Sequence, residues 1–259
     1  MYFCAMTKVV IIGTGNVARQ LFRALQKTGK TKVVQVVGRN PIALNYFSKH
    51  TPTGNLKGIS TEADIYIIAV SDDAISSVSE LITFKEKLVV HTSGSVGLKA
   101  LSGPYRKGVC YPLQTFSRER DVDFREIPVL IETDTTKDLV LLRELAMGLS
   151  DNVLEVSSEK RRFLHLAAVF ANNFTNHLCH ISSELLREKA LPFSLLLPLI
   201  RESAEKLSQM EPYDAQTGPA RRGDQATMEE HMKLLGNKSH WEIYTLLSNS
   251  IKHTYAKKL

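Results

Sequence analysis

Apolar residues in the first 155 positions cluster in short runs separated by polar stretches, a pattern typical of buried parallel strands that alternate with helices. After the first run, an amphipathic stretch puts Leu21, Phe22 and Leu25 on one side of a predicted helix. Another helix is expected from about Thr135 to Leu149. The expected strands span 8–12, 32–37, 64–70, 88–91 and 127–131. This alternation predicts an α/β fold with a doubly wound sheet.

From Ser157 onward the apolar pattern becomes helical, and no strand pattern returns. The expected helices run from Ser158 to about Lys189 and from Pro192 to about Gln209, and two more follow Asp224 and Ser239. Because no flexible spacer marks the change, we expect two directly packed domains, 1–155 and an all-helical 156–259. Apolar runs such as 193–197 exceed what a small domain buries alone, so we also expect a homodimer.

The first strand runs directly into a glycine-rich turn, Gly13-Thr14-Gly15-Asn16-Val17-Ala18. A G-x-G-x-x-A turn inside a βαβ unit is typical of Rossmann-type dinucleotide-binding domains. Gly13 allows the tight turn, Gly15 lets the backbone approach a pyrophosphate, and Ala18 lets helix and strand pack closely. The amide groups at the helix start, at Asn16 and Val17, would face the phosphates. The alternative is a tight turn that binds no ligand.

The end of the second strand distinguishes between the two nicotinamide dinucleotides. An NAD site has Asp or Glu there to bind the ribose hydroxyls, whereas this strand ends in Val37-Gly38-Arg39-Asn40. The first 61 residues contain no Asp or Glu. A guanidinium can hold a 2′-phosphate that a carboxylate would repel, so we predict NADP(H), with Arg39 on the 2′-phosphate and Asn40 beside it. Alternatively, Arg39 is a solvated loop residue.

Two later strands end in polar residues at the carboxyl edge, where open α/β sheets bind ligands. The third run ends in Val70-Ser71-Asp72, and the fourth ends in His91, which is followed by a loop of small residues that contains Ser93. We expect these residues to complete the cofactor site.

The composition excludes several other classes of protein. The chain of 259 residues has a formal net charge of +6, but the basic excess lies largely in the first third, so small anionic ligands explain it and nucleic acid is not expected. No leader pattern precedes the first strand, and prolines break the apolar stretch 191–200, so we expect neither secretion nor membrane insertion. Three widely spaced cysteines, Cys4, Cys110 and Cys179, indicate a reducing cytoplasm rather than a disulfide framework.

The first helical segment of the second half carries the main candidates for proton chemistry. His165 could donate a proton, and Lys160, at a helix start that disfavours cations, could hold a substrate carboxylate. On an α-helix, His165, Asn172 and Asn176 would share one stripe, with Asn173 about 80° from His165 and able to orient the substrate. The alternatives are a satisfied core histidine, an asparagine bonded to a neighbouring helix and a solvated lysine.

Two other clusters occur in the helical half. His177, Cys179 and His180 lack a carboxylate or a C-x-x-C pair, so we expect no metal site. Thr217-Gly218-Pro219-Ala220-Arg221-Arg222-Gly223-Asp224 predicts a rigid bend that ends in an N-cap at Asp224. Arg222 either holds an anion in the cleft, or it pairs with Asp224 or faces water.

Together these stretches resemble the Rossmann dehydrogenases with an all-helical second domain, the superfamily of 6-phosphogluconate dehydrogenase, ketopantoate reductase and pyrroline-5-carboxylate reductase. Within it, the chain is most similar to a family of NADP oxidoreductases without an assigned substrate. The matching stretches are 13–18, 91–95, 111–116, the helix with Lys160, His165 and Asn173, and 217–224.

The resemblance implies NADP(H) in the N-terminal domain, a site at the domain interface and dimerisation through the helices. The hydroxyacid dehydrogenases of this superfamily place an asparagine four residues after a helix lysine. Here Leu164 stands four residues after Lys160, so their mechanism does not transfer.

We therefore expect an NADP(H)-dependent oxidoreductase that transfers hydride to a small carbonyl or imine, with His165, Asn173, Lys160 and Arg222 as catalytic candidates. Lys160 and Arg222 would hold a substrate carboxylate. Two alternatives remain open: a non-catalytic NADP(H)-binding sensor or scaffold, and a reductase that passes hydride between NADP and a deazaflavin.

Overall fold

The computed structural model of the protein describes residues 6–256, and the chain divides into two compact units, Met1–Val169 and Phe170–Leu259. The first helix of the second half, α5 (Ser158–Ala168), belongs by its contacts to the first unit. The domain boundary that we predict between residues 155 and 156 lies where strands give way to helices, and it stays a prediction. Cys4 lies outside the described residues.

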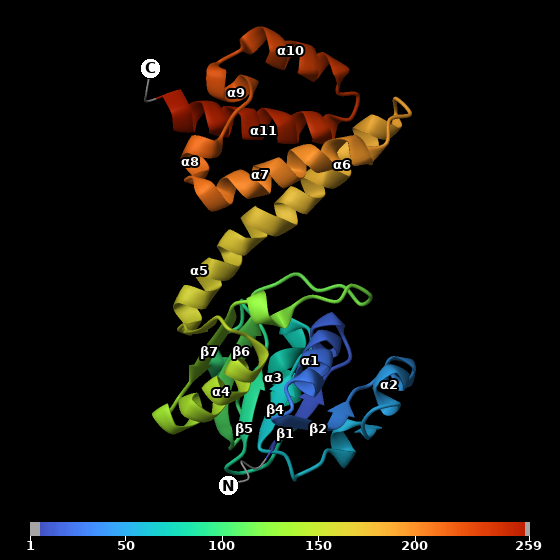
Figure 1. Cartoon of the computed structure of the whole chain (residues 1–259), viewed down its shortest axis with the longest axis vertical. Helices are drawn as coiled ribbons and strands as arrows, with labels where there is room; N and C mark the ends of the chain where they lie inside the picture. Colours follow the sequence, from blue (N-terminus) through green and yellow to red (C-terminus); the bar gives the residue numbers. More distant parts are fainter. Residues whose placement is uncertain (1–5, 257–259) are drawn as a thin grey trace. The chain divides into compact units, whose positions relative to one another are not determined.

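The first unit is built on one eight-stranded sheet of order β3-β2-β1-β4-β5-β6-β7-β8 (Figure 1). Neighbouring strands run parallel, except that β6 and β7 are antiparallel. This topology confirms the predicted Rossmann-type sheet. The strands are β1 (Thr7–Ile12), β2 (Thr31–Val37), β3 (Thr53–Gly54), β4 (Ile65–Ile68), β5 (Leu88–His91), β6 (Arg106–Pro112), β7 (Val129–Thr133) and β8 (Val153–Glu155).

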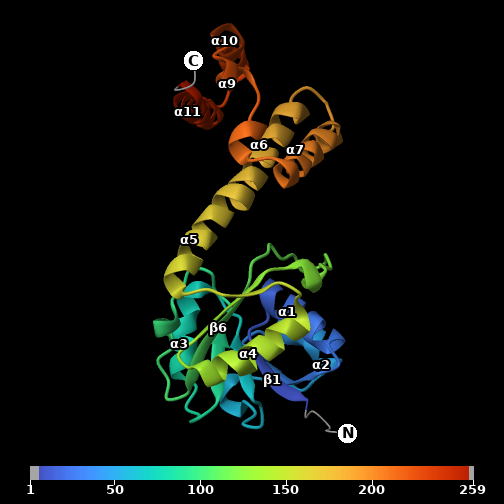
Figure 2. The same cartoon turned by 60° about the vertical axis from the view of Figure 1, so that its left-hand side comes forward.

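Helices cover both faces of this sheet. On one face, α1 (Asn16–Lys27), α2 (Pro41–Ser48) and α4 (Thr136–Leu149) share a core with the strands, and α3 (Ile75–Glu80) packs on the other face. Figure 2 shows β6 between α3 and α4. As predicted, α1 buries Leu21, Phe22 and Leu25.

The long helix predicted from 158 to 189 is present, but its type changes along its length. After α5, residues Val169–Phe174 are π-helical, and the α-helical bonding returns in α6 (Thr175–Arg187). In a π-helix the bond from residue i reaches i+5, so each turn takes an additional residue. The stripe calculated for a regular α-helix therefore does not hold beyond Ala168, and the predicted alignment of His165 with Asn172 and Asn176 is wrong.

The second unit is entirely helical over the residues that the structure describes. α6 and α7 lie side by side in both views (Figures 1 and 2). Over residues 170–256, only Ile181, Ala220 and Met228 are buried, so this unit has almost no core of its own. Besides α6, its helices are α7 (Leu197–Gln209), α8 (Pro212–Ala215), α9 (Pro219–Arg222), α10 (Gln225–Leu234) and α11 (Lys238–Tyr255).

Candidate active site

A cleft of about 980 Å³ opens at the carboxyl ends of β1, β2 and β4, the edge where an open α/β sheet binds its ligand. Among residues 6–256, no carboxylate lines it. Among the predicted cofactor residues, those that line the cleft are Gly13, Gly15, Asn16, Val17, Arg39, Asn40, Val70 and Ser71. The sequence did not single out Asn55, Leu56, Lys57, Val78 and Leu81, which also line it.

The two glycines of the turn differ in what surrounds them. Gly13 has φ +131°, and a Cβ built on it would lie 2.1 Å from the carbonyl oxygen of Ala69, so only glycine fits. A Cβ on Gly15 would meet nothing within 4 Å, which leaves open space above the start of α1. That space is where a dinucleotide pyrophosphate would approach the free amide groups of the helix.

The far end of the cleft carries two cations, Arg39 and Lys57. Both side chains are exposed, and neither forms an ion pair with any residue that the structure describes. Asn40, beside Arg39, is the N-cap of α2. Its side-chain oxygen accepts hydrogen bonds from Ile42 N at 2.9 Å and from Ala43 N at 3.3 Å. Two cations suit a 2′-phosphate. The cleft has no carboxylate among the described residues that could accept hydrogen bonds from the ribose hydroxyls of NAD.

Four predicted cofactor residues lie outside the cleft lining. Ala18 is fully buried and packs in the core under the turn, in the packing role expected of it. The other three, Asp72, His91 and Ser93, belong to a polar network in the loops after β4 and β5. Their assignment as cofactor ligands stays a prediction.

His91 is fully buried at the end of β5. Burial lowers the pKa of His91 to about 4, and the Arg161 charge acts in the same direction. The imidazole is therefore neutral at physiological pH, and its Nδ1 accepts a hydrogen bond from Ser93 N at 3.2 Å. These contacts fold the loop that follows the strand.

Ser93 and Asp72 continue this network toward solvent. Ser93 Oγ accepts hydrogen bonds from Ser95 N at 3.2 Å and Val96 N at 3.0 Å, which closes the loop into a tight turn. Ser95 Oγ donates to the Asp72 carboxylate. The loops after β4 and β5 are thus tied together next to Ser71 of the cleft.

His165 of α5 lies over this loop and contacts Tyr111 of β6. The Tyr111 hydroxyl is 3.2 Å from His165 Nδ1, and the rings meet edge to face with centroids 6.1 Å apart. Gly94 lies against both, since a Cβ on it would come within 2.7 Å of His165 Nδ1 and of the Tyr111 ring. The structure thus joins a predicted proton donor to a tyrosine for which the sequence predicts no catalytic role.

A buried cation fixes α5 to the sheet. Arg161 is fully buried and donates to Glu132 Oε2 at 2.5 Å and to the carbonyl oxygen of Val96 at 2.8 Å. Ser158 donates its hydroxyl to the same carboxylate at 2.7 Å. Burial raises the pKa of Glu132, but the hydrogen bonds from Arg161 and Ser158 outweigh it and the pKa is lowered. Arg161, one turn before His165, therefore determines where that histidine lies.

The remaining candidates are not gathered around His165 by the described contacts. Lys160 is exposed and lies about 140° around the α-helix from His165. Asn173 is exposed within the π-helical turn, and Arg222 is exposed at the end of α9. Asp224 caps α10 as predicted, accepting a hydrogen bond from Thr227 N at 3.2 Å. The catalytic roles of Lys160, Asn173 and Arg222 stay predictions.

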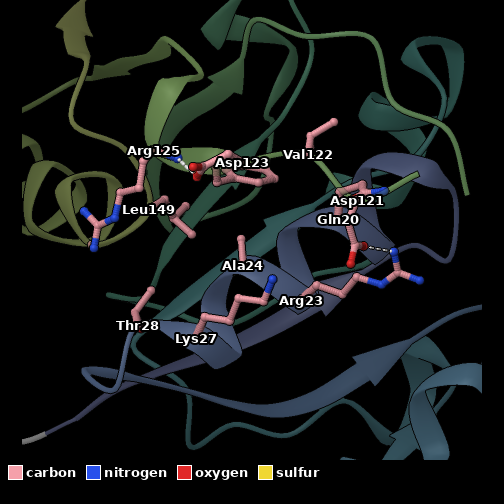
Figure 3. A pocket seen from close by; sticks show the side chains of 12 residues that line it. Gln20, Arg23, Ala24, Lys27, Thr28, Asp121, Val122, Asp123, Arg125 and Leu149 are labelled. Carbon is pink, nitrogen blue, oxygen red and sulfur yellow. Dashed lines mark hydrogen bonds and ion pairs between the residues drawn. The ribbon is translucent and has the colours of Figure 1, made fainter. Parts of the chain in front are cut away.

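A second cavity, of about 420 Å³, lies between α1, the end of α4 and residues 121–125 (Figure 3). Its charged side chains are largely paired: Arg23 contacts Asp121 at 2.5 Å, and Arg125, whose guanidinium points away from Asp123 in the figure, contacts Asp151 at 3.1 Å. The cavity extends along the second half of α1, away from the glycine turn, so it is not part of the cofactor cleft.

Residues 6–256 lack the features of two other kinds of site. None of the helices in that range combines the length and apolar character that a membrane span needs. No group of three or more His, Cys, Asp or Glu side chains in the same range is placed to hold a metal ion. Cys110 and Cys179 are free, and burial raises the pKa of Cys110 to about 12.

Comparisons with known proteins agree with this geometry. Residues 8–94 match a family model described as NADP oxidoreductase, coenzyme F420-dependent, and residues 127–251 match a domain of unknown function. A Bacteroides fragilis crystal structure, described as a putative NADP oxidoreductase, is 39% identical with a TM-score of 0.90, covering 96% of this chain and 99% of its own. No curated protein sequence matches the chain.

Two more distant structures share the fold. A Thermotoga maritima protein is 22% identical with a TM-score of 0.72, over 96% of this chain and 99% of its own. A reductive aminase from Aspergillus terreus, in complex with NADPH and ethyl levulinate, is 14% identical with a TM-score of 0.68, over 98% and 95% of the two chains.

The glycine turn, the carboxylate-free cleft and the sheet order define a Rossmann-type oxidoreductase with a helical second half. The chain belongs to the family of NADP oxidoreductases that includes the Bacteroides fragilis protein, and NADP(H) is the cofactor of this family.

Proposed function

We propose that this protein reduces a small carbonyl or imine substrate with NADPH and that His165 supplies the proton. The observation that carries the proposal is a series of contacts that leads from the lining of the cofactor cleft to the loop beside His165. Val70 and Ser71 line the cleft, and the next residue, Asp72, bonds to Ser95 in the loop whose Gly94 packs against His165. The reductive aminase with the same fold acts with NADPH, which agrees with an imine or carbonyl substrate.

In the proposed reaction, each group has a separate role. Bound NADPH would supply a hydride to the electrophilic carbon. His165, protonated on both nitrogens, gives one proton to the substrate oxygen or nitrogen and is left as a neutral imidazole that solvent reprotonates. The turn at Gly13 and Gly15 would hold the pyrophosphate, and Asn173, Lys160 and Arg222 are the proposed contacts to the substrate and its carboxylate.

We expect His165→Gln to lower kcat for the carbonyl or imine substrate by about 100- to 10,000-fold, the range usual for loss of a general acid. NADPH affinity should stay within about twofold, because His165 does not line the cleft. Steady-state consumption of NADPH with a panel of small aldehydes, ketones and ketone–amine mixtures provides the measurement.

His231→Gln is the matched control, because His231 forms the same kind of pair with Tyr244 at 2.9 Å on α10 and α11. Full turnover in His165→Gln would remove the histidine from the mechanism. NADPH binding without turnover of any substrate by the unmodified protein would favour the sensor or scaffold.

We expect Arg39→Asp to reduce the preference for NADPH over NADH by about 10- to 150-fold, since charge-assisted hydrogen bonds contribute about 1.5–3 kcal/mol each. Calorimetric titration with both dinucleotides measures the ratio. Lys30→Asp makes the same charge change on an exposed residue outside the cleft and should leave the ratio unchanged. An equal ratio in both variants would refute the role of Arg39.

A second candidate function has one observation in its favour. The family model over residues 8–94 names coenzyme F420, a deazaflavin, so the substrate could be that ring system rather than a carbonyl. The match covers the nucleotide-binding half alone and gives no residue that would hold the deazaflavin. Stoichiometric reduction of added F420 by NADPH, with no turnover of the carbonyl panel, would favour this function.

We also propose that the protein acts as a homodimer. The second unit buries only three of its residues over 170–256 and exposes Leu195 at 60%, Leu199 at 64% and Leu246 at 70%. A second copy of the chain would cover this apolar surface. Sedimentation velocity on the intact chain tests this, and a monomer at micromolar concentration would contradict it.

We also propose that the protein is cytoplasmic, because its described cysteines are free. Cys110 and Cys179 are free thiols, as expected in a reducing compartment. Detection of the native protein outside the cytoplasmic fraction would contradict it.

A further inference from the structure

The contacts of His165 differ at its two ring nitrogens. Nδ1 lies 3.2 Å from the Tyr111 hydroxyl. Gly94 packs against the same nitrogen, since a Cβ built on Gly94 would lie 2.7 Å from Nδ1. No hydrogen bond to Nε2 is found among the residues that the structure describes. Only Nε2 is therefore left to reach a substrate.

We propose that Tyr111 is a positioning residue of the reductase, whose hydroxyl holds His165 by Nδ1 so that Nε2 is the atom that gives up the proton. The inference rests on the proposed function and deepens it. The sequence motifs and the family resemblance assign Tyr111 no role.

The direction of the hydrogen bond follows from the surroundings of Tyr111. Burial raises the pKa of Tyr111, and the Asp72 carboxylate raises it further, while Arg161 lowers it. The hydroxyl therefore keeps its proton at neutral pH. His165 Nδ1 is the acceptor that the described structure offers to this partly buried hydroxyl, so the phenol donates and the neutral ring carries its proton on Nε2.

The same contact persists when the ring is charged. A hydroxyl both donates and accepts, so an imidazolium can donate Nδ1–H to the Tyr111 oxygen while Nε2–H faces the substrate. Transfer of the Nε2 proton leaves the ring neutral with Nδ1–H bonded to the Tyr111 oxygen, and solvent then returns a proton to Nε2. Without substrate, the imidazolium instead loses its Nδ1 proton as the pH rises, because Tyr111 then donates to Nδ1 and the resting neutral ring keeps Nε2–H. The charged groups that act on Tyr111 are Asp72 after β4 and Arg161 on α5, and His91 on β5 is neutral.

The test compares Tyr111→Phe with Tyr244→Phe, because Tyr244 is the hydroxyl of the other histidine–tyrosine pair. The first measurement is ¹⁵N NMR of the histidine side chains at alkaline pH, with the His165 signals assigned from the spectrum of His165→Gln. We expect the Nε2–H tautomer at His165 in the unmodified protein and in Tyr244→Phe, and a mixture of tautomers in Tyr111→Phe.

The second measurement is steady-state turnover. We expect Tyr111→Phe to lower kcat by about tenfold or more, with the KM for the carbonyl and the Kd for NADPH within about twofold of the unmodified protein. A purely structural role of Tyr111 would instead lower stability and raise KM without altering the tautomer.

The outcomes separate this inference from the proposed function. If the unmodified protein turns over no carbonyl or imine, the proposed function fails, while the NMR result still decides whether Tyr111 orients the ring. An Nδ1–H tautomer in the unmodified protein would overturn the inference, and so would a fully active Tyr111→Phe with an unchanged tautomer. The tautomer in the unmodified protein remains decisive even if Tyr111→Phe does not fold.

Discussion

Arg161→Met is expected to lower the free energy of unfolding by about 3–5 kcal/mol at pH 7, the loss usual when one partner of a buried ion pair is removed. Arg161 is fully buried, and besides Ser158 of its own helix it donates to the Glu132 carboxylate of β7 and to the Val96 carbonyl of the loop after β5. Methionine fills much of the space but removes the Arg161 donor from both acceptors, and it leaves the Glu132 carboxylate with its hydrogen bonds from Ser158 and no cation beside it. Urea denaturation followed by circular dichroism measures the change.

The decrease in the free energy of unfolding that Arg161→Met causes should depend on pH. In the unmodified protein the folded-state pKa of Glu132 is lowered, so its contribution to stability is present above the ordinary carboxyl pKa and is lost as the pH falls through the folded-state value. Without Arg161, burial still acts to raise that pKa and only the hydrogen bonds from Ser158 oppose it, so the pKa of Glu132 should be higher in the variant and protonation should cost the variant less stability. The difference between the two proteins should therefore shrink from pH 7 to pH 4.

Arg162→Met is the control, since Arg162 is the exposed neighbour on the same helix. It should alter the free energy of unfolding by no more than about 0.5 kcal/mol. Equal losses in both variants, or a difference that grows toward acidic pH, would contradict the assignment of the buried pair as the anchor of α5.

Gly13→Ala is expected to destabilise the protein by about 4 kcal/mol or more and to abolish NADPH binding. The residue has φ +131°, which alanine rarely adopts, and the new methyl group would lie 2.1 Å from a backbone oxygen of Ala69. Neither β1 nor β4 can move away, because both are buried strands paired with each other. Thermal unfolding with and without NADPH gives both quantities.

Gly15→Ala separates the two functions of the turn. Its φ is −74°, and an added Cβ meets nothing within 4 Å, so the stability of the unliganded protein should change little. The methyl group would occupy the space proposed for the pyrophosphate, so the stabilisation by NADPH should fall. If Gly15→Ala binds NADPH with unchanged affinity, the pyrophosphate does not lie above this residue.

The sequence predicted the nucleotide-binding half well for a local reason. The strand, the turn and α1 are specified by neighbouring residues, so the G-x-G-x-x-A pattern and the apolar side of Leu21, Phe22 and Leu25 were sufficient. Strand β6 escaped prediction because Arg106 and Lys107 open it and Pro112 closes it. Its place in the sheet depends on pairing with β5 and β7 rather than on its own composition.

The candidate site was harder to predict because its contacts join distant segments. Tyr111 and His165 are 54 residues apart, and Arg161 and Glu132 are 29 apart, so no local pattern pairs them. The unfavourable cations at the start of α5 were the available signal, since they indicated that something must hold them, and Arg161 is held by Glu132. The π-helical turn, in contrast, had no signal that we recognised.

The anchoring of α5 has a consequence for how this enzyme could evolve. In the function we propose, the acid and the nucleotide both belong to the first unit, so the groups that bind the cofactor and supply the proton come from residues 6–169. Substitutions in the helical unit could then change the substrate during evolution, while the residues that bind the cofactor and supply the proton stay the same.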